Sequence, residues 1–131
     1  MAHNGTHISQ LATVAIPVAD PDRALGFYVG VLGFEKRMDA SFGQGQRWVE
    51  VAPAGASTTI ALAPPGGSAH AVDTGIRLST GDCEADHREL RARGVDTDDI
   101  LQWPGVPPMF ALRDPDGNTL YVVQQADRSG G

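Results

Sequence analysis

The sequence predicts an α+β fold in which one strand–helix–strand–strand–strand (βαβββ) module occurs twice. Three observations support this prediction. Residues 14–34 combine an alternating apolar segment, a helix cap and an apolar stripe at helical spacing. Residues 75–95 repeat this order later in the chain. Each copy is followed by short segments of strand composition separated by turn residues. Such a repeat indicates one supersecondary unit that is used twice.

The first copy begins with a strand over residues 12–18, where the alternation is typical of a strand covered on one side. Asp20 offers a carboxylate to the free amides of a helix start, and Pro21 fits the first helical position because it has no N–H to leave unpaired. Gly33 ends the helix. The apolar stripe of this helix is formed by Ala24, Phe27, Tyr28, Val31 and Leu32.

Three more strands complete the first copy. We expect them over residues 35–42, 47–52 and 58–63. The Gly-Gln-Gly sequence at 43–45 predicts the first hairpin turn, and residues 53–55 predict the second.

The second copy repeats the order. A strand is followed by Asp82, which takes the place of the first cap, and the helix extends to about Arg93. Residues 114–118, Asp-Pro-Asp-Gly-Asn, have the composition of a tight turn. The remaining strands are predicted over 96–102, 109–113 and 119–125.

These elements divide the chain into five segments. The predicted segments are a flexible tail over 1–10, a first βαβββ module over 11–63, a linker over 64–72, a second module over 73–125 and a tail over 126–131.

Composition and charge exclude several classes of function. The 131 residues suit one compact domain or two small modules with a shared core. A formal charge of -6 disfavours nucleic-acid binding and suits cationic or neutral ligands. No apolar run is long enough for a membrane span, so we expect a cytoplasmic protein with no membrane partner. Cys83 is the single cysteine, which excludes an internal disulfide.

Three stretches together resemble the vicinal oxygen chelate superfamily of glyoxalases, bleomycin-resistance proteins and extradiol dioxygenases. They are VAIPVADPDRALGFYVGVLGF, GIRLSTGDCEADHRELRARGV and FALRDPDGNTLYVVQ. The resemblance implies that each module forms a curved, incomplete barrel with a ligand cavity on its concave face. It also implies a homodimer whose two chains share these cavities. In character the sequence is most similar to the metal-free, antibiotic-binding members.

Metal-dependent members of this superfamily usually carry His, Gln or Glu at four strand positions. The resemblance places Thr13, Ala61, Gly75 and Tyr121 at these positions. None is a usual ligand of a divalent metal, so we expect no metal and no cofactor.

Strand alternation predicts which side chains face the concave side, because successive side chains point to opposite faces of a sheet. Thr13, Ala61 and Gly75 then form a floor of small residues in place of a metal site. Trp103 lies in a loop beside prolines, where it could cover a pocket or a partner or simply pack against the protein. The predicted ligand-binding residues are Trp48, Glu50, Ala61, Gly75, Arg77, Trp103, Met109 and Tyr121.

We therefore expect a binding protein that sequesters an aromatic or polycyclic small molecule, such as an antibiotic, without catalysis. The alternative is an enzyme of glyoxalase or dioxygenase type with an atypical or absent metal site, for which Glu50 and Tyr121 are the candidate acid–base groups. A structural interpretation is that Trp48 and Tyr121 fill a closed core or a dimer interface. A third hypothesis is a regulatory or purely structural module, for which the sequence has no distinct motif. Arg77 could also pair with Glu50. No catalytic residue is predicted.

Overall fold

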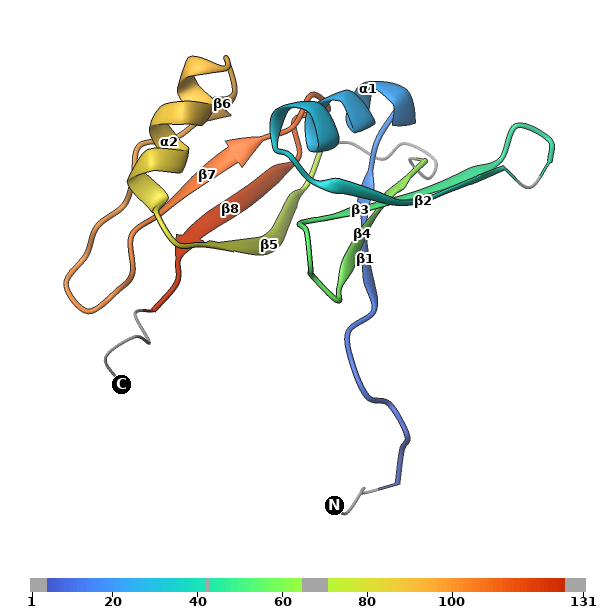
Figure 1. Ribbon diagram of the computed structural model, residues 1–131, viewed down its shortest axis with the longest axis horizontal. Helices are drawn as coiled ribbons and strands as arrows, with labels where there is room; N and C mark the ends of the chain where they lie inside the picture. The colour runs from blue at the N-terminus through green and yellow to red at the C-terminus, as the bar shows by residue number, and fades with distance from the viewer. Residues whose placement is uncertain (1–4, 42, 65–70, 127–131) are drawn as a thin grey trace.

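The computed structural model describes residues 5–41, 43–64 and 71–126. They form two four-stranded sheets, each with helical structure packed on one face (Figure 1). The strand orders are β1-β4-β3-β2 and β5-β8-β7-β6. In both sheets the first strand of the module pairs in parallel with the last, and the other pairs are antiparallel. The predicted α+β class with two βαβββ modules is confirmed, and the sheets do not close into barrels.

Parts of the predicted tails and linker lie outside the described residues, namely 1–4, 65–70 and 127–131. The last residue of the predicted strand 35–42 also lies outside them. The boundaries of the five predicted segments stay a prediction.

The first module follows the predicted order closely. Its helix begins at the predicted N-cap, where Asp20 accepts hydrogen bonds from the amides of Asp22 and Arg23. The second half of the helix is wider than an α-helix, with the Leu32 amide bonded to the Phe27 carbonyl five residues earlier at 2.9 Å. The elements are β1 (Thr13–Pro17), α1 (Pro21–Leu25), η1 (Gly26–Val31), β2 (Glu35–Ser41), β3 (Arg47–Ala52) and β4 (Thr59–Ala63).

In the second module the predicted strand over 96–102 is wrong in extent. Only Asp96 and Thr97 form a strand, followed by one isolated bridge between Leu101 and Met109. The segment is rich in Asp, which strands disfavour, and it leads into a proline-rich loop that lacks donors for a sheet. The elements are β5 (Asp73–Thr80), α2 (Cys83–Ala92), β6 (Asp96–Thr97), β7 (Met109–Arg113) and β8 (Thr119–Gln124).

Helix α2 also contains His87 and Cys83, of which the first is half-buried and the second fully buried. His87 is half-buried against Phe110, with 4.9 Å between ring centroids. Cys83 is buried, and this burial together with nearby acidic groups raises the pKa of its thiol.

No helix in the described part of the chain is long and apolar enough to cross a membrane.

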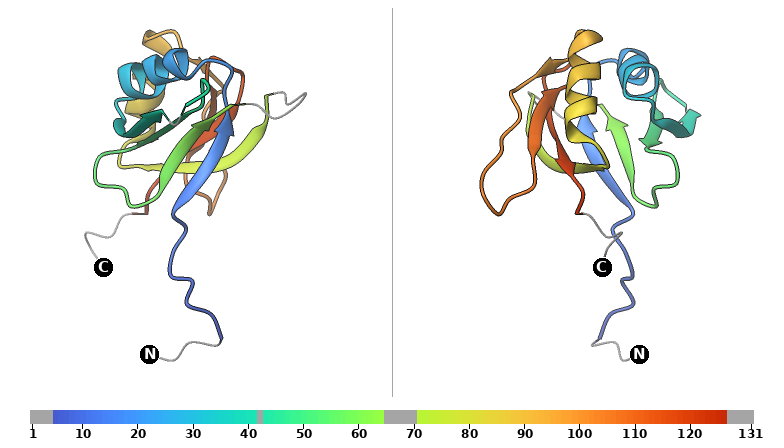
Figure 2. Two further views of the ribbon diagram at one scale, coloured as in Figure 1. Left: turned by 90° about the vertical axis from the view of Figure 1, so that its right-hand side faces the viewer. Right: turned by 60° about the vertical axis from the view of Figure 1, so that its left-hand side comes forward.

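The core lies on the helical side of both sheets. Most of the side chains that alternation assigns to this side are buried, as Ile16 in β1 and Leu120 in β8 illustrate. Val14, Ile76 and Leu78 are half-buried and pack against the core. Buried apolar residues of the two modules form one continuous cluster, so the modules share a core. Its largest fully buried apolar members are Tyr28, Phe110, Ile16, Leu62, Leu112 and Leu120. Figure 2 shows α1 and α2 at the same end of the molecule, with the N-terminal segment extended away from them.

The turn at residues 114–118 connects the second module to the first. Asp114 accepts a 2.8 Å hydrogen bond from the Tyr28 hydroxyl, and Asn118 donates a 2.8 Å bond to the Pro17 carbonyl. Asp116 accepts a bond from the amide of Ala19 at 3.0 Å. Burial, reinforced by the adjacent carboxylates, raises the pKa of the Tyr28 hydroxyl well above its usual value. These bonds, of which the one between Tyr28 and Asp114 is buried, fix the two modules against each other.

Candidate functional site

The faces of the two sheets opposite the core are partly open to solvent, although Ala61 on the first sheet is buried, with an exposed fraction of 1%. Alternation predicted this side as the concave one, and Trp48, Glu50 and Tyr121 on it are half-buried rather than part of the core. We call the residues on the first sheet the first face and those on the second sheet the second face. The first face consists of Thr13, Trp48, Glu50, Thr59 and Ala61. The second face consists of Asp73, Arg77, Met109, Arg113, Thr119 and Tyr121.

Glu50 is the hydrogen-bonding centre of the first face. The Trp48 indole Nε1 donates to its Oε2 at 2.6 Å, and the Thr59 hydroxyl donates to its Oε1 at 2.7 Å. The hydroxyls of Thr13 and Thr59 lie 2.9 Å apart and share a further hydrogen bond. The bonds from Trp48 and Thr59 lower the pKa of Glu50. Its carboxylate is therefore ionised at neutral pH and holds the Trp48 ring in a fixed orientation.

Tyr121 is the corresponding centre of the second face. Its hydroxyl donates a 2.7 Å hydrogen bond to Asp73, which also accepts the Gly75 amide at 3.1 Å. The guanidinium carbon of Arg77 lies 4.8 Å from the centre of the Tyr121 ring, a cation–π distance. The hydrogen bond to Asp73 raises the pKa of Tyr121 and lowers that of Asp73. The tyrosine is thus neutral and fixed at physiological pH.

A cavity of about 340 Å³ lies on the second face and extends below the loop that follows β6. Arg113 in its wall forms a bidentate pair with Asp98, at 2.8 and 3.1 Å. Since Asp73 and Asp99 also line the cavity, carboxylates outnumber cations there. Its apolar surface comes from Leu101, Met109, Phe110 and Ala111. The combination suits a neutral or cationic ligand with an apolar body.

The structure brings the predicted site residues into two groups and leaves one apart. The first group is Trp48, Glu50 and Ala61, with Glu50 and Ala61 paired across β3 and β4. The second group is Gly75, Arg77, Met109 and Tyr121. Trp103 lies apart, 67% exposed, on a turn closed by the Val106 amide and the Trp103 carbonyl at 3.1 Å. Among the described residues there is no ion pair between Arg77 and Glu50.

The structure explains why a glycine occupies position 75, and the sequence alone did not indicate this reason. It was predicted to leave space at the cavity floor, and it does line a hollow of about 450 Å³ beside β1. Its backbone, however, has a φ of +70° at a break in the register between β5 and β8. A residue with a side chain is strained in that conformation.

Sequence reasoning missed three polar residues around the second face, Asp73, Asp98 and Arg113. Strand alternation could have found two of them, because Asp73 shares the parity of Gly75 and Arg113 shares that of Met109. Asp98 follows a strand that is shorter than predicted, so alternation gives no signal for it.

The residues at the four expected metal positions do not fit a metal. The Thr13 hydroxyl is bonded to Thr59, and the Tyr121 hydroxyl is bonded to Asp73. Ala61 and Gly75 have no side-chain donor. Within residues 5–41, 43–64 and 71–126, no group of three or more His, Cys, Asp or Glu side chains could hold an ion. No step that requires a metal follows from this donor set.

Comparisons with known proteins agree on one family. The sequence model of the Glyoxalase/Bleomycin resistance protein/Dioxygenase superfamily matches residues 10–122. The uncharacterized protein YetH of Bacillus subtilis strain 168 is 28% identical over 122 residues, which is 89% of this chain and 99% of YetH.

Two solved structures share both fold and about a third of the sequence. A member of the same superfamily from Sphaerobacter thermophilus DSM 20745 is 34% identical with a TM-score of 0.84, over 92% of this chain and 100% of that one. TnmS3, an antibiotic binding protein from Streptomyces sp. CB03234, is also 34% identical, with a TM-score of 0.79 over 92% of this chain and 99% of its own.

Proposed function

Because the chain belongs to the glyoxalase/bleomycin resistance protein/dioxygenase superfamily, we propose that it is a non-catalytic protein that binds and sequesters a small aromatic natural product of antibiotic type. The similarity to TnmS3 supports binding of this class of ligand. We propose that binding takes place in the cytoplasm, requires no metal and confers drug resistance.

The observation that carries the proposal is that two aromatic rings on solvent-open faces are held rigidly by carboxylates. Glu50 fixes Trp48, and Asp73 fixes Tyr121. A ring that is already ordered loses little conformational entropy when a flat ligand stacks on it. Binding thus needs no rearrangement of the platform.

The same hydrogen bonds make these groups poor acid–base catalysts. A general acid or base works best with a pKa near the working pH. The pKa of Glu50 is lowered and that of Tyr121 is raised, so both move away from neutrality. This supports binding over the enzymatic alternative at the two positions where sequence reasoning had placed it.

We propose that the ligand lies between two copies of the chain in a homodimer. The first and second faces belong to different sheets of one chain, so each aromatic platform needs a second wall. A second copy would supply it by placing its second face opposite the first face. The loop carrying Leu101, Trp103 and Val106 supports this, because these apolar side chains are 50%, 67% and 47% exposed.

The two tryptophans, Trp48 and Trp103, make a matched fluorescence experiment available. In Trp103→Phe the remaining reporter is Trp48, and a polycyclic aromatic antibiotic such as doxorubicin should quench it saturably. In Trp48→Phe the affinity should fall by about tenfold or more, since stacked aromatic contacts contribute strongly. Equal affinity in both variants, or no saturable quenching with either doxorubicin or the glycopeptide bleomycin, contradicts the proposal.

Two further measurements on the same sample separate sequestration from catalysis and test the dimer. Sedimentation should give a dimer, with the ligand bound stoichiometrically. Bound ligand released by denaturation should have an unchanged mass. A modified ligand, or activity that depends on an added divalent metal, would instead favour a glyoxalase- or dioxygenase-like enzyme.

A further inference from the structure

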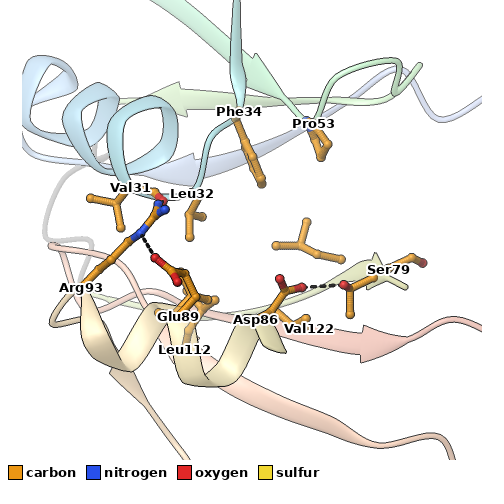
Figure 3. A pocket seen from close by; sticks show the side chains of 13 residues that line it. Val31, Leu32, Phe34, Pro53, Ser79, Asp86, Glu89, Arg93, Leu112 and Val122 are labelled. Atoms are coloured by element: carbon orange, nitrogen blue, oxygen red, sulfur yellow. Dashed lines mark hydrogen bonds and ion pairs between the residues drawn. The ribbon is translucent and has the colours of Figure 1, made fainter. Parts of the chain in front are cut away.

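A separate pocket of about 310 Å³ lies between the two modules, on the helical side of the sheets (Figure 3). Leu32, Phe34 and Pro53 form its wall from the first module. Helix α2 and the end of β5 form its wall from the second module, with Leu78, Leu90 and Val122 at the base. It contains none of the residues of the first or second face.

The pocket arises because the duplicated modules differ at equivalent positions. Tyr28 and Leu90 each stand eight residues after the helix cap of their module. Asp114 and Pro53 each follow the third strand of their module. At one junction Tyr28 and Asp114 meet in a buried hydrogen bond. At the other, Leu90 and Pro53 line a hollow instead.

The hollow has an apolar lining and one uncompensated negative charge. Glu89 is neutralised by Arg93 at 2.8 Å, and Arg93 also donates to the Val31 carbonyl at 2.6 Å, which closes one end. Asp86 accepts a hydrogen bond from the neutral Thr80 hydroxyl and has no ion pair among the described residues. Figure 3 shows Asp86 pointing from α2 toward the space below Phe34 and Pro53.

The position of Asp86 is the second difference between the modules. Four residues after its own cap the first module has Ala24, which is fully buried in the core. A charged residue at this helix position needs a polar environment or a counter-ion. In the second module the pocket supplies access to solvent, and no cation of the described chain completes the site.

We propose that this pocket binds a small organic cation, an alkyl- or aryl-ammonium ion whose apolar body lies against Leu32, Phe34 and Leu90 and whose ammonium group pairs with Asp86. The pocket volume lies at the lower end of the range for small-molecule sites, which suits a ligand of about ten non-hydrogen atoms. The site is independent of the proposed antibiotic-binding faces, because it shares no residue with them.

The test uses three probes with the same hydrocarbon skeleton and different charge: 3-phenylpropylamine, 3-phenylpropan-1-ol and 3-phenylpropionate. Titrations followed by backbone amide NMR should map the amine to Leu32, Phe34, Ser79 and Asp86. We expect a Kd on the order of 1 mM for a ligand of this size. The alcohol should bind about fivefold to tenfold more weakly, because it lacks the charge-assisted hydrogen bond, and the anion should bind more weakly still.

Two variants and a matched control assign the effect. Asp86→Asn should lower the affinity for the amine to that for the alcohol, since the amide still accepts from Thr80 but carries no charge. Glu84→Gln is the control, because it makes the same charge change on an exposed position of α2 that does not line the pocket. Ser79→Phe should block the pocket and abolish shifts for every probe, even if Asp86→Asn alters folding.

Several outcomes would overturn the proposal. Equal binding of the amine to wild type and Asp86→Asn would remove the role of the carboxylate. Amine-induced shifts on the first or second face alone would place the cation elsewhere. Shifts at the pocket that depend on protein concentration without any probe would show that a second copy of the chain fills it.

Discussion

The turn between β7 and β8 is bonded into the opposite module, whereas the turn between β3 and β4, at the equivalent place, is held by its own module. In the first of these turns, Asp114 and Asn118 bond to Tyr28 and Pro17. In the second, Arg37 of β2 donates to the carbonyls at positions 53 and 56, both at 2.9 Å. One junction of the duplicated fold therefore centres on a buried polar bond, and the other on a pocket lined by Leu90 and Pro53, with the bond from Arg93 to the Val31 carbonyl at its edge.

This difference shows that the repeat specifies the fold of each module but not how the modules join. A carboxylate and a phenol at one junction give directional contacts that define an orientation. A leucine and a proline at the other cannot reproduce them, and the shared core tolerates a pocket there. We therefore expect the relative orientation of the modules, and with it the placement of the two faces, to depend more on the buried bonds of Asp114 and Asn118 than on the single bond from Arg93 to the Val31 carbonyl.

The largest expected effect comes from Asp114→Ala. This change removes the acceptor of the Tyr28 hydroxyl and of the Asn118 side chain, and it also removes the acceptor of two turn amides. Buried groups that lose a charged partner cost about 1.5–3 kcal/mol each, so the free energy of unfolding should fall by about 3 kcal/mol or more. Urea denaturation followed by circular dichroism measures it.

Pro53→Ala is the matched control at the hollow junction. We expect a loss below about 1 kcal/mol, because the proline is only half-buried and lines one side of a pocket. A similar loss in both variants would contradict the view that the two junctions differ in strength.

Tyr28→Phe should have a smaller effect, about 1–2 kcal/mol at neutral pH, since Asp114 keeps its bonds from Asn118. Its signature is the alkaline limb of the stability curve. The pKa of Tyr28 is raised in the folded state, so above about pH 10 the unfolded chain loses this proton first and stability falls as pH rises. The variant should lose less stability than wild type over this range.

Tyr121→Phe is the comparison for this alkaline effect. The pKa of Tyr121 is raised as well, but chiefly by its hydrogen bond to Asp73, with burial as the second cause, whereas burial is the largest cause for Tyr28. Its alkaline contribution should be the smaller of the two, measured by denaturation at pH 9 and pH 11. A steeper loss assigned to Tyr121 would contradict the importance of the buried junction.

Much of the fold could be predicted because its signals are local. The Asp20 and Asp82 caps and the alternation around Ile16 and Leu120 depend on neighbouring residues, and each of these predictions is confirmed. The strand after α2 failed where local signals are weak. Beyond Thr97 the Asp98 amide still bonds to the Ala111 carbonyl at 2.9 Å, but the next pairing with β7 is only the isolated bridge between Leu101 and Met109.

The candidate site was less predictable because it depends on contacts between distant residues. The bond between Tyr28 and Asp114 joins residues 86 apart, and no periodicity in the sequence indicates it. Alternation along each strand could assign Trp48 and Tyr121 to the correct side of their sheets. It could not show that the two residues lie on separate faces, because that depends on how the modules are joined. The prediction of concave-side residues in the second module started at Gly75, where the repeat begins. Asp73, which accepts the hydrogen bond of Tyr121, was therefore left out of the predicted site.

The smallest expected effect compares the carboxylates of the two faces. Thr59→Val removes one of two donors to Glu50, so the pKa of Glu50 should rise toward that of an ordinary glutamate, about 4.3. Tyr121→Phe should likewise raise the pKa of Asp73, which loses its first donor but keeps the Gly75 amide. Side-chain carboxyl NMR titration measures both pKa values.

Because a lowered pKa stabilises the folded state at pH values above the unfolded pKa, each variant should also lose less stability than wild type as pH falls below about 4. If the pKa of Glu50 stays lowered without Thr59, the Trp48 indole alone fixes the carboxylate, and the first face is simpler than the second.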